Sequence, residues 1–157
     1  MVEDVVLDRA KGELRILGER NMALNVEALC RHLDGLVGQS VAEVIIRNHE
    51  FRLGKEDAER RRKETANAST EEIIEYFKEN DVLSGAGVTK CTVQPDKTVL
   101  VEISNPCVKE TIGAAKSLLF AYWSGVLSHL FGKEYDTTQV HFNESKDIMS
   151  ALIAPRG

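Results

Sequence analysis

Apolar positions are most concentrated in residues 109–132, a segment whose pattern predicts a long helix. At helical spacing one apolar stripe runs along the segment, and further apolar residues widen it through the middle almost to the full circumference. The stripe consists of Ile112, Ala115, Leu119, Trp123, Val126 and Leu130. A helix that is apolar on most sides is usually buried by other elements. We therefore expect this helix to form the centre of the core and to end at Gly132, a typical C-terminal cap.

The first half of the chain has mainly helical periodicity. Apolar residues three and four apart predict a short helix over residues 7–18 and another over 26–36, which Asn25 would cap. A brief strand is expected at residues 21–24.

Two capping boxes predict where later helices begin. Ser40 with Glu43 would open a long helix, and Ser69 with Glu72 would open the next one, which Asn80 is expected to end. Between them, residues 50–64 carry six basic and five acidic side chains. Such a mixed run is typical of a solvated helix face with ion pairs rather than of a nucleic-acid site.

After the turn at residues 84–87 the periodicity becomes strand-like. The expected strands are residues 88–93 and 98–103 around a loop at 94–97, and then residues 134–143 and 148–154. This order predicts an α+β fold, with an antiparallel sheet packed against the long buried helix. We expect one domain over 1–157, with a helical half (1–80) and a hairpin–helix–hairpin half (81–157).

Composition excludes several functional classes. The net charge of −5 argues against nucleic acid or an anionic membrane as a partner. The long helix is also interrupted by polar residues too often to span a bilayer. The acidic start of the chain does not resemble a signal peptide, and three unpaired cysteines suit reduced thiols, so a cytoplasmic location is expected.

Motifs for catalysis or cofactor binding are not visible. The sequence has no phosphate loop, dinucleotide fingerprint, nucleophile elbow or zinc-protease helix, so neither a catalytic residue nor a cofactor is expected. Its four histidines are never at metal-ligand spacing. Cys107 is the best thiolate candidate, because it would lie just before the N-terminus of the long helix.

Two stretches resemble a known family. Residues 83–106 (LSGAGVTKCTVQPDKTVLVEISNP), followed by residues 120–132 and a terminal hairpin, are similar to the 4-vinyl reductase or hydrocarbon-binding domain. This family shares a fold with TRAPP vesicle-transport subunits and haem NO-binding sensor domains. Many members hold zinc with a helix cysteine and a C-x7-C pair. Here the pair falls on His141 and Met149, so no metal site is expected.

The resemblance implies a homodimer that forms through the N-terminal helices, and an apolar ligand cavity between helices and sheet. The side chains expected to line that cavity are Phe120, Tyr122, Trp123, Phe131, Phe142 and Met149. Our leading hypothesis is a non-catalytic sensory or regulatory domain that binds a small apolar ligand. The alternatives are a dimeric protein-interaction module without a ligand, and an accessory factor or reductase of tetrapyrrole metabolism.

Overall fold

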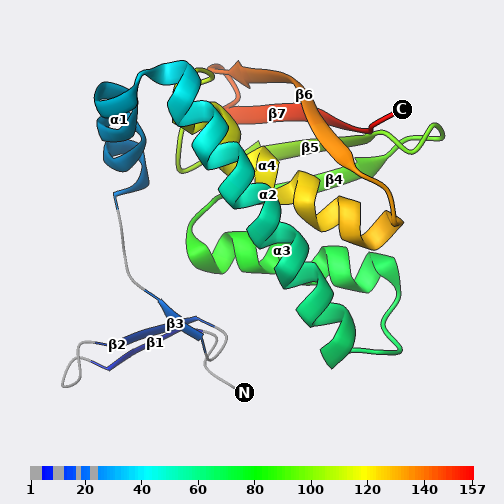
Figure 1. The fold of residues 1–157 in the computed structure, drawn as a ribbon. Coiled ribbons are helices and arrows are strands. Elements are labelled where there is room, and N and C mark those ends of the chain that lie inside the picture. Colours follow the sequence, from blue (N-terminus) through cyan, green and yellow to red (C-terminus); the bar gives the residue numbers. More distant parts are fainter. Residues whose placement is uncertain (1–4, 9–12, 17–18, 22–24) are drawn as a thin grey trace.

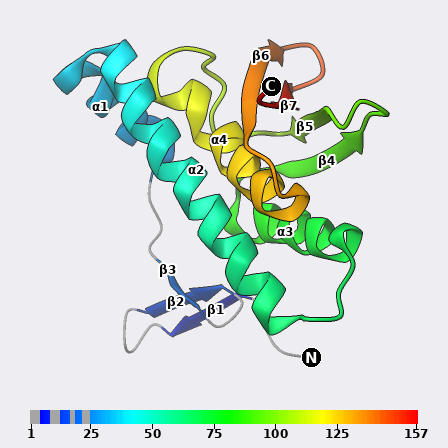
Figure 2. The same ribbon diagram turned by 45° about the vertical axis from the view of Figure 1, so that its right-hand side comes forward.

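The computed structural model describes residues 5–8, 13–16, 19–21 and 25–157. The helices in these residues are α1 (Val26–Val37), α2 (Gln39–Glu64), α3 (Thr70–Ser84) and α4 (Gly113–Phe131). The strands are β1 (Val5–Asp8), β2 (Glu13–Ile16), β3 (Glu19–Asn21), β4 (Val88–Val93), β5 (Val99–Ser104), β6 (Tyr135–Asn143) and β7 (Ile148–Pro155). Figures 1 and 2 show α4 between α2 and the sheet of β4–β7. The α+β fold is confirmed.

The main sheet has the strand order β4-β5-β7-β6, and every neighbouring pair is antiparallel. Two hairpins, β4–β5 and β6–β7, are joined in the middle of the sheet by pairing of β5 with β7. Alternate residues of these central strands are buried, including Val101 opposite Ala151 and Ile103 opposite Met149. This alternation gives the sheet one apolar face, which α4 covers.

Helix α4 is the buried centre of the domain, as its apolar pattern predicts. Trp123, Val126 and Leu127 have at most 1% of their surface exposed. The helix begins at Gly113 rather than at residue 109, because Gly113 has a φ of +59°. Its N-terminus is capped from another helix, since the backbone N–H of Ala114 donates to Oδ1 of Asp34 on α1 at 2.9 Å.

Helices α2 and α4 approach each other closely where each has a glycine. A Cβ atom on Gly54 would lie 2.1 Å from the carbonyl oxygen of Tyr122, and one on Gly125 would lie 2.0 Å from that of Phe51. Side chains at these positions would therefore force the two backbones apart. The contact fixes the position of the middle of α2 relative to Tyr122.

The N-terminal prediction is wrong for the residues that the structure describes. Instead of a helix over residues 7–18, β1, β2 and β3 form a small antiparallel sheet. Figures 1 and 2 show this sheet apart from the main sheet. Only residue 21 of the strand expected at 21–24 is described, and it belongs to β3; residues 22–24 lie outside the described part.

Of the predicted caps, those at Asn25 and Ser69 are confirmed. The side chain of Asn25 accepts from Ala28 N, and Ser69 forms a reciprocal capping box with Glu72. The box at Ser40 is wrong, because α2 begins directly after Gly38 and has no side-chain cap.

Helix α3 continues past Asn80 to Ser84 and ends at Gly85, whose φ of +80° is favourable for glycine. Glu43, expected in the capping box at Ser40, instead contacts Lys116 of α4 at 3.1 Å.

Strand β6 contains a β-bulge between Thr138 and His141, with Gln139 at a φ of +53°. The extra residue reverses the side-chain alternation that the sequence predicts. Phe142 therefore faces the covered side of the sheet opposite Met149, while His141 is exposed.

The polar stretch of α2 forms the predicted solvated helix face. Ion pairs one turn apart include Lys63 with Glu59 at 2.7 Å and Arg60 with Asp57 at 2.8 Å. In the described part of the chain, no helix combines the length and apolar character needed to cross a bilayer.

Candidate functional site

A pocket of about 560 Å³ lies among the helices. Its walls come from the start of α1, the middle of α2, the C-terminal end of α3 with the turn that follows, and α4. The lining residues are Asn25, Val26, Glu27, Glu50, Leu53, Asp57, Asn80, Asp81, Ser84, Gly85, Ala86, Cys107, Leu118, Leu119, Tyr122 and Trp123. None belongs to a strand of the main sheet. The pocket thus differs in position from the expected cavity between helices and sheet, because α4 fills that space with core side chains.

Asp81 is the most buried carboxylate in the pocket wall, with 7% of its surface exposed. Its Oδ2 atom accepts hydrogen bonds from the indole N–H of Trp123, at 2.9 Å, and from the hydroxyl of Thr89. Burial raises the pKa of Asp81 to about 6, although these two hydrogen bonds oppose the shift. Asp81 is therefore an acid that titrates close to neutral pH.

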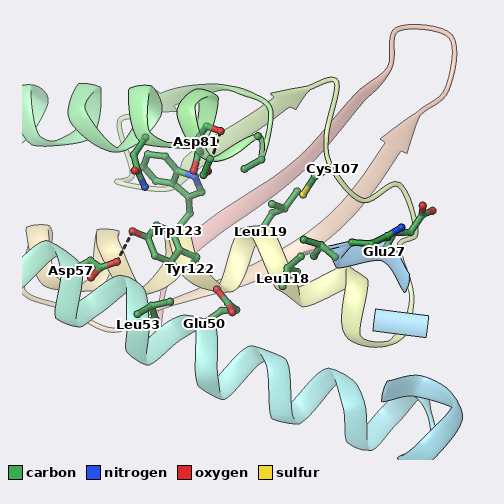
Figure 3. Close-up of a pocket in the computed structure, with 16 residues that line it drawn as sticks. Glu27, Glu50, Leu53, Asp57, Asp81, Cys107, Leu118, Leu119, Tyr122 and Trp123 are labelled. Carbon is green, nitrogen blue, oxygen red and sulfur yellow. Dashed lines mark hydrogen bonds between the residues drawn. The ribbon is translucent and has the colours of Figure 1, made fainter. Parts of the chain in front are cut away.

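The α2 side of the pocket carries two further acids. The hydroxyl of Tyr122 donates to Oδ2 of Asp57 at 3.0 Å, which links α4 to α2 across the pocket (Figure 3). Burial raises the pKa of Glu50, and the nearby charge of Asp57 raises it further, while His49 lowers it. Burial, with the charge of Asp57, also raises the pKa of Tyr122, which stays a neutral hydrogen-bond donor.

The six side chains proposed from the sequence fall in different places. Tyr122 and Trp123 line the pocket together. Phe120 and Met149 are completely buried in the core, and neither lines the pocket. Phe131 packs against the ring of Tyr135, with centroids 5.6 Å apart.

The sixth, Phe142, lines a second pocket of about 380 Å³ between β6 and the segment before α4. Lys109, Glu110, Thr111, Ile112, Val140, His141 and Glu144 complete it. Lys109 also forms an ion pair with Asp147 at 2.7 Å.

Sequence reasoning missed the acids of the larger pocket. A signal existed for Asp81, because an acid in the last turn of a helix faces the negative end of the helix dipole. That turn of α3 contains no basic residue that would compensate. For Glu50 and Asp57 the sequence offers no such signal, since they lie in a long polar run and only the crossing of α2 with α4 makes them partly buried.

The cysteines show no sign of an activated thiolate. Burial raises the pKa of Cys30 to about 11 and that of Cys91 to about 12. Burial also raises the pKa of Cys107. Because α4 begins only at Gly113, Cys107 does not lie directly before a helix N-terminus as expected. Within the described residues, no group of three or more His, Cys, Asp or Glu side chains has an arrangement that could hold a metal ion.

Comparison with known proteins finds solved structures of similar fold, and one of them is a ligand-responsive sensory domain. No family model matches the chain, and no curated protein matches it in sequence. The chain is similar to the phenol-responsive sensory domain of the transcription activator PoxR, in its crystal structure with phenol. The TM-score is 0.73 at 16% sequence identity, over 97% of this chain and 85% of that one. The chain therefore shares its fold with this sensory domain.

Proposed function

We propose that this protein is a non-catalytic sensory or regulatory domain that binds a small molecule with an apolar body in the pocket beside Trp123. The observation that carries the proposal is the pocket itself. Its volume, about 560 Å³, falls in the range of small-molecule sites, and it combines aromatic and aliphatic walls with a few convergent polar groups. Tyr122 and Trp123 supply the rings, and Leu118 and Leu119 supply aliphatic surface.

The shared fold supports this proposal, because the similar domain responds to phenol. The position of the pocket also suits a sensor. It lies where α1, α2, α3 and α4 meet, so an occupant that contacts α2 and α4 would change the energy of their relative arrangement.

Filling the pocket tests the proposal. Leu53 is 37% exposed and lines the pocket from α2, so Leu53→Trp places extra bulk there without replacing a core residue. Val82→Trp is the matched control, because Val82 is 52% exposed on α3 and does not line the pocket.

Thermal unfolding should be followed with phenol and with benzyl alcohol as probes. We expect at least one of them to raise the melting temperature of the wild type and of Val82→Trp, but not that of Leu53→Trp. Equal responses from all three proteins, or no response from the wild type, would count against the pocket.

A dimeric interaction module is the second candidate, and six exposed apolar side chains on α1 and α2 favour it. Leu29, Leu36 and Val37 of α1 and Val41, Val44 and Ile45 of α2 are each 42–67% exposed. Val41, Val44 and Ile45 are three and four residues apart and so share one face of α2. We propose that a second copy of the chain covers these six side chains, hereafter the α1–α2 patch, since such surfaces mark interaction sites. The two candidates are compatible, since a dimer can carry the ligand pocket.

A further inference from the structure

The charges around the larger pocket have one sign. Four carboxylates line it: Glu27, Glu50, Asp57 and Asp81. None of the described residues that line the pocket is a lysine, an arginine or a histidine. A low-dielectric site with this lining attracts positive charge and repels anions. Charge thus restricts the ligand class more narrowly than shape does.

The outer carboxylates already have cationic partners. Asp57 accepts a hydrogen bond from Arg60 at 2.8 Å through Oδ1, and Glu27 lies 3.4 Å from Arg31. Both arginine side chains are more than half exposed, so they neutralise the rim of the pocket from the solvent side. A ligand gains little from these two acids.

The inner carboxylates have no such partner among the described residues. Asp81 receives only the neutral donors Trp123 and Thr89, both at Oδ2. Among the described residues, no hydrogen bond to Oδ1 is found, and Asp81 is one of the residues that line the pocket. Glu50 has only the imidazole of His49, at 3.8 Å.

Figure 3 shows how these groups surround one space. Asp81 lies on the α3 side, Glu50 and Leu53 lie on the α2 side, and the rings of Tyr122 and Trp123 stand between them. A positive group in this space would thus also lie near the two rings, and aromatic rings attract cations when water is excluded.

We propose that the ligand is an organic cation, a protonated amine on an aromatic or aliphatic body. The ammonium donates to Asp81, the more buried of the two acids, Glu50 adds a second negative charge to the lining, and the body packs on Leu118, Leu119 and Tyr122. The cation supplies the positive charge that no described lining residue provides for these two buried acids. This inference rests on the proposed function, since it names the ligand class of the same pocket.

Three probes of nearly equal size separate charge from shape: benzylamine, benzyl alcohol and benzoate. Calorimetric titration into the wild type should give the tightest binding for benzylamine and none for benzoate. Hydrogen bonds to charged groups are worth about 1.5–3 kcal/mol, so benzylamine should bind about tenfold or more tightly than benzyl alcohol.

Variants then assign the preference to the inner acids. Asp81→Asn keeps an acceptor for Trp123 and Thr89 but removes the charge, and Glu50→Gln does the same on α2. Asp81→Asn should weaken benzylamine binding about tenfold and Glu50→Gln should weaken it less, while both leave benzyl alcohol within about threefold. Glu75→Gln is the control, because this exposed acid of α3 pairs with Lys78 and does not line the pocket, and it should change neither affinity by more than about threefold.

The outcomes distinguish this inference from the proposed function. Benzyl alcohol binding as tightly as benzylamine would overturn the inference and leave the ligand pocket standing. Benzylamine binding that survives both charge-removing variants would place the cation elsewhere and overturn the inference too. Failure of all three probes to bind would overturn both.

Discussion

Trp123 donates its indole N–H to the buried carboxylate of Asp81 across a distance of 2.9 Å, joining the middle of α4 to the last turn of α3. The same pair forms part of the pocket wall. A buried indole requires such an acceptor, but an uncharged one would serve it as well. A buried carboxylate lowers the stability of the fold where a neutral acceptor would not. A buried carboxylate in a pocket wall is therefore a candidate for function.

Asp81 should make the protein less stable at neutral pH than in mild acid. Its pKa rises from 3.8 to about 6 on folding, so the folded state holds the proton more tightly than the unfolded state. The resulting stabilisation is complete below about pH 4 and is lost as the pH rises through about 6, with a total of about 3 kcal/mol.

Asp81→Asn removes this titration while keeping an acceptor for Trp123. Relative to the wild type, its free energy of unfolding should therefore improve by about 2 kcal/mol between about pH 4 and about pH 7, measured by urea denaturation. A difference between variant and wild type that does not change with pH would show that Asp81 is not the responsible group.

Gly125→Ala should strongly destabilise the fold. The new Cβ would meet the carbonyl oxygen of Phe51 at 2.0 Å, and backbone cannot rotate away as a side chain can. We expect a loss of about 3 kcal/mol or more in the free energy of unfolding. Gly35→Ala is the control on α1, where nothing lies within 4 Å, and should gain up to about 1 kcal/mol. Similar effects of the two substitutions would contradict the close contact of α2 and α4.

Asp34→Ala should cost about 1 kcal/mol, because it removes the acceptor that caps α4 at Ala114. Asp34→Asn keeps an oxygen in that position and loses only the favourable charge at the helix N-terminus, so it should cost about half as much. Chemical denaturation of both variants measures the difference. If the asparagine variant proved the less stable of the two, the capping role would be wrong.

The α1–α2 patch should control self-association. We expect the wild type to be a dimer, and Val41→Glu combined with Ile45→Glu to give a monomer, since two charges would be buried without partners. Light scattering during size-exclusion chromatography measures the mass. Val82→Glu, an equally exposed apolar position on α3, should leave the dimer intact. A monomeric wild type, or a dimer that survives both charges, would argue against this surface.

Local signals predicted most elements well, and a long-range contact accounts for one of the errors. The capping box at Ser69 and the hairpin around residues 94–97 depend on neighbours in sequence, and both are confirmed. The start of α4 depends on Asp34 in another helix, which a local pattern does not show. The start of α2, in contrast, follows directly on Gly38, which also ends α1, and the capping-box pattern at Ser40 was misleading there.

The pocket was harder to predict than the fold. Aromatic residues on α4 were the reasonable choice, but a helix buried on most sides divides them between core and pocket, and only neighbouring elements decide which. Phe142 lies on the covered face of the sheet, but it lines the second pocket and not the larger one. Glu50 and Asp57 lie in a polar stretch whose charges ion pairing on a solvated helix face already explained. Nothing in the sequence therefore set Glu50 apart.

Native mass spectrometry of the purified protein tests the central claim, that the pocket holds a small molecule, most directly. Spectra should be recorded under gentle and then stronger activation, for the wild type and for Leu53→Trp. We predict a reproducible extra mass on the wild type that stronger activation removes and that the pocket-filling variant lacks. A wild type without any adduct, or the same adduct on both proteins, would contradict a ligand in this pocket.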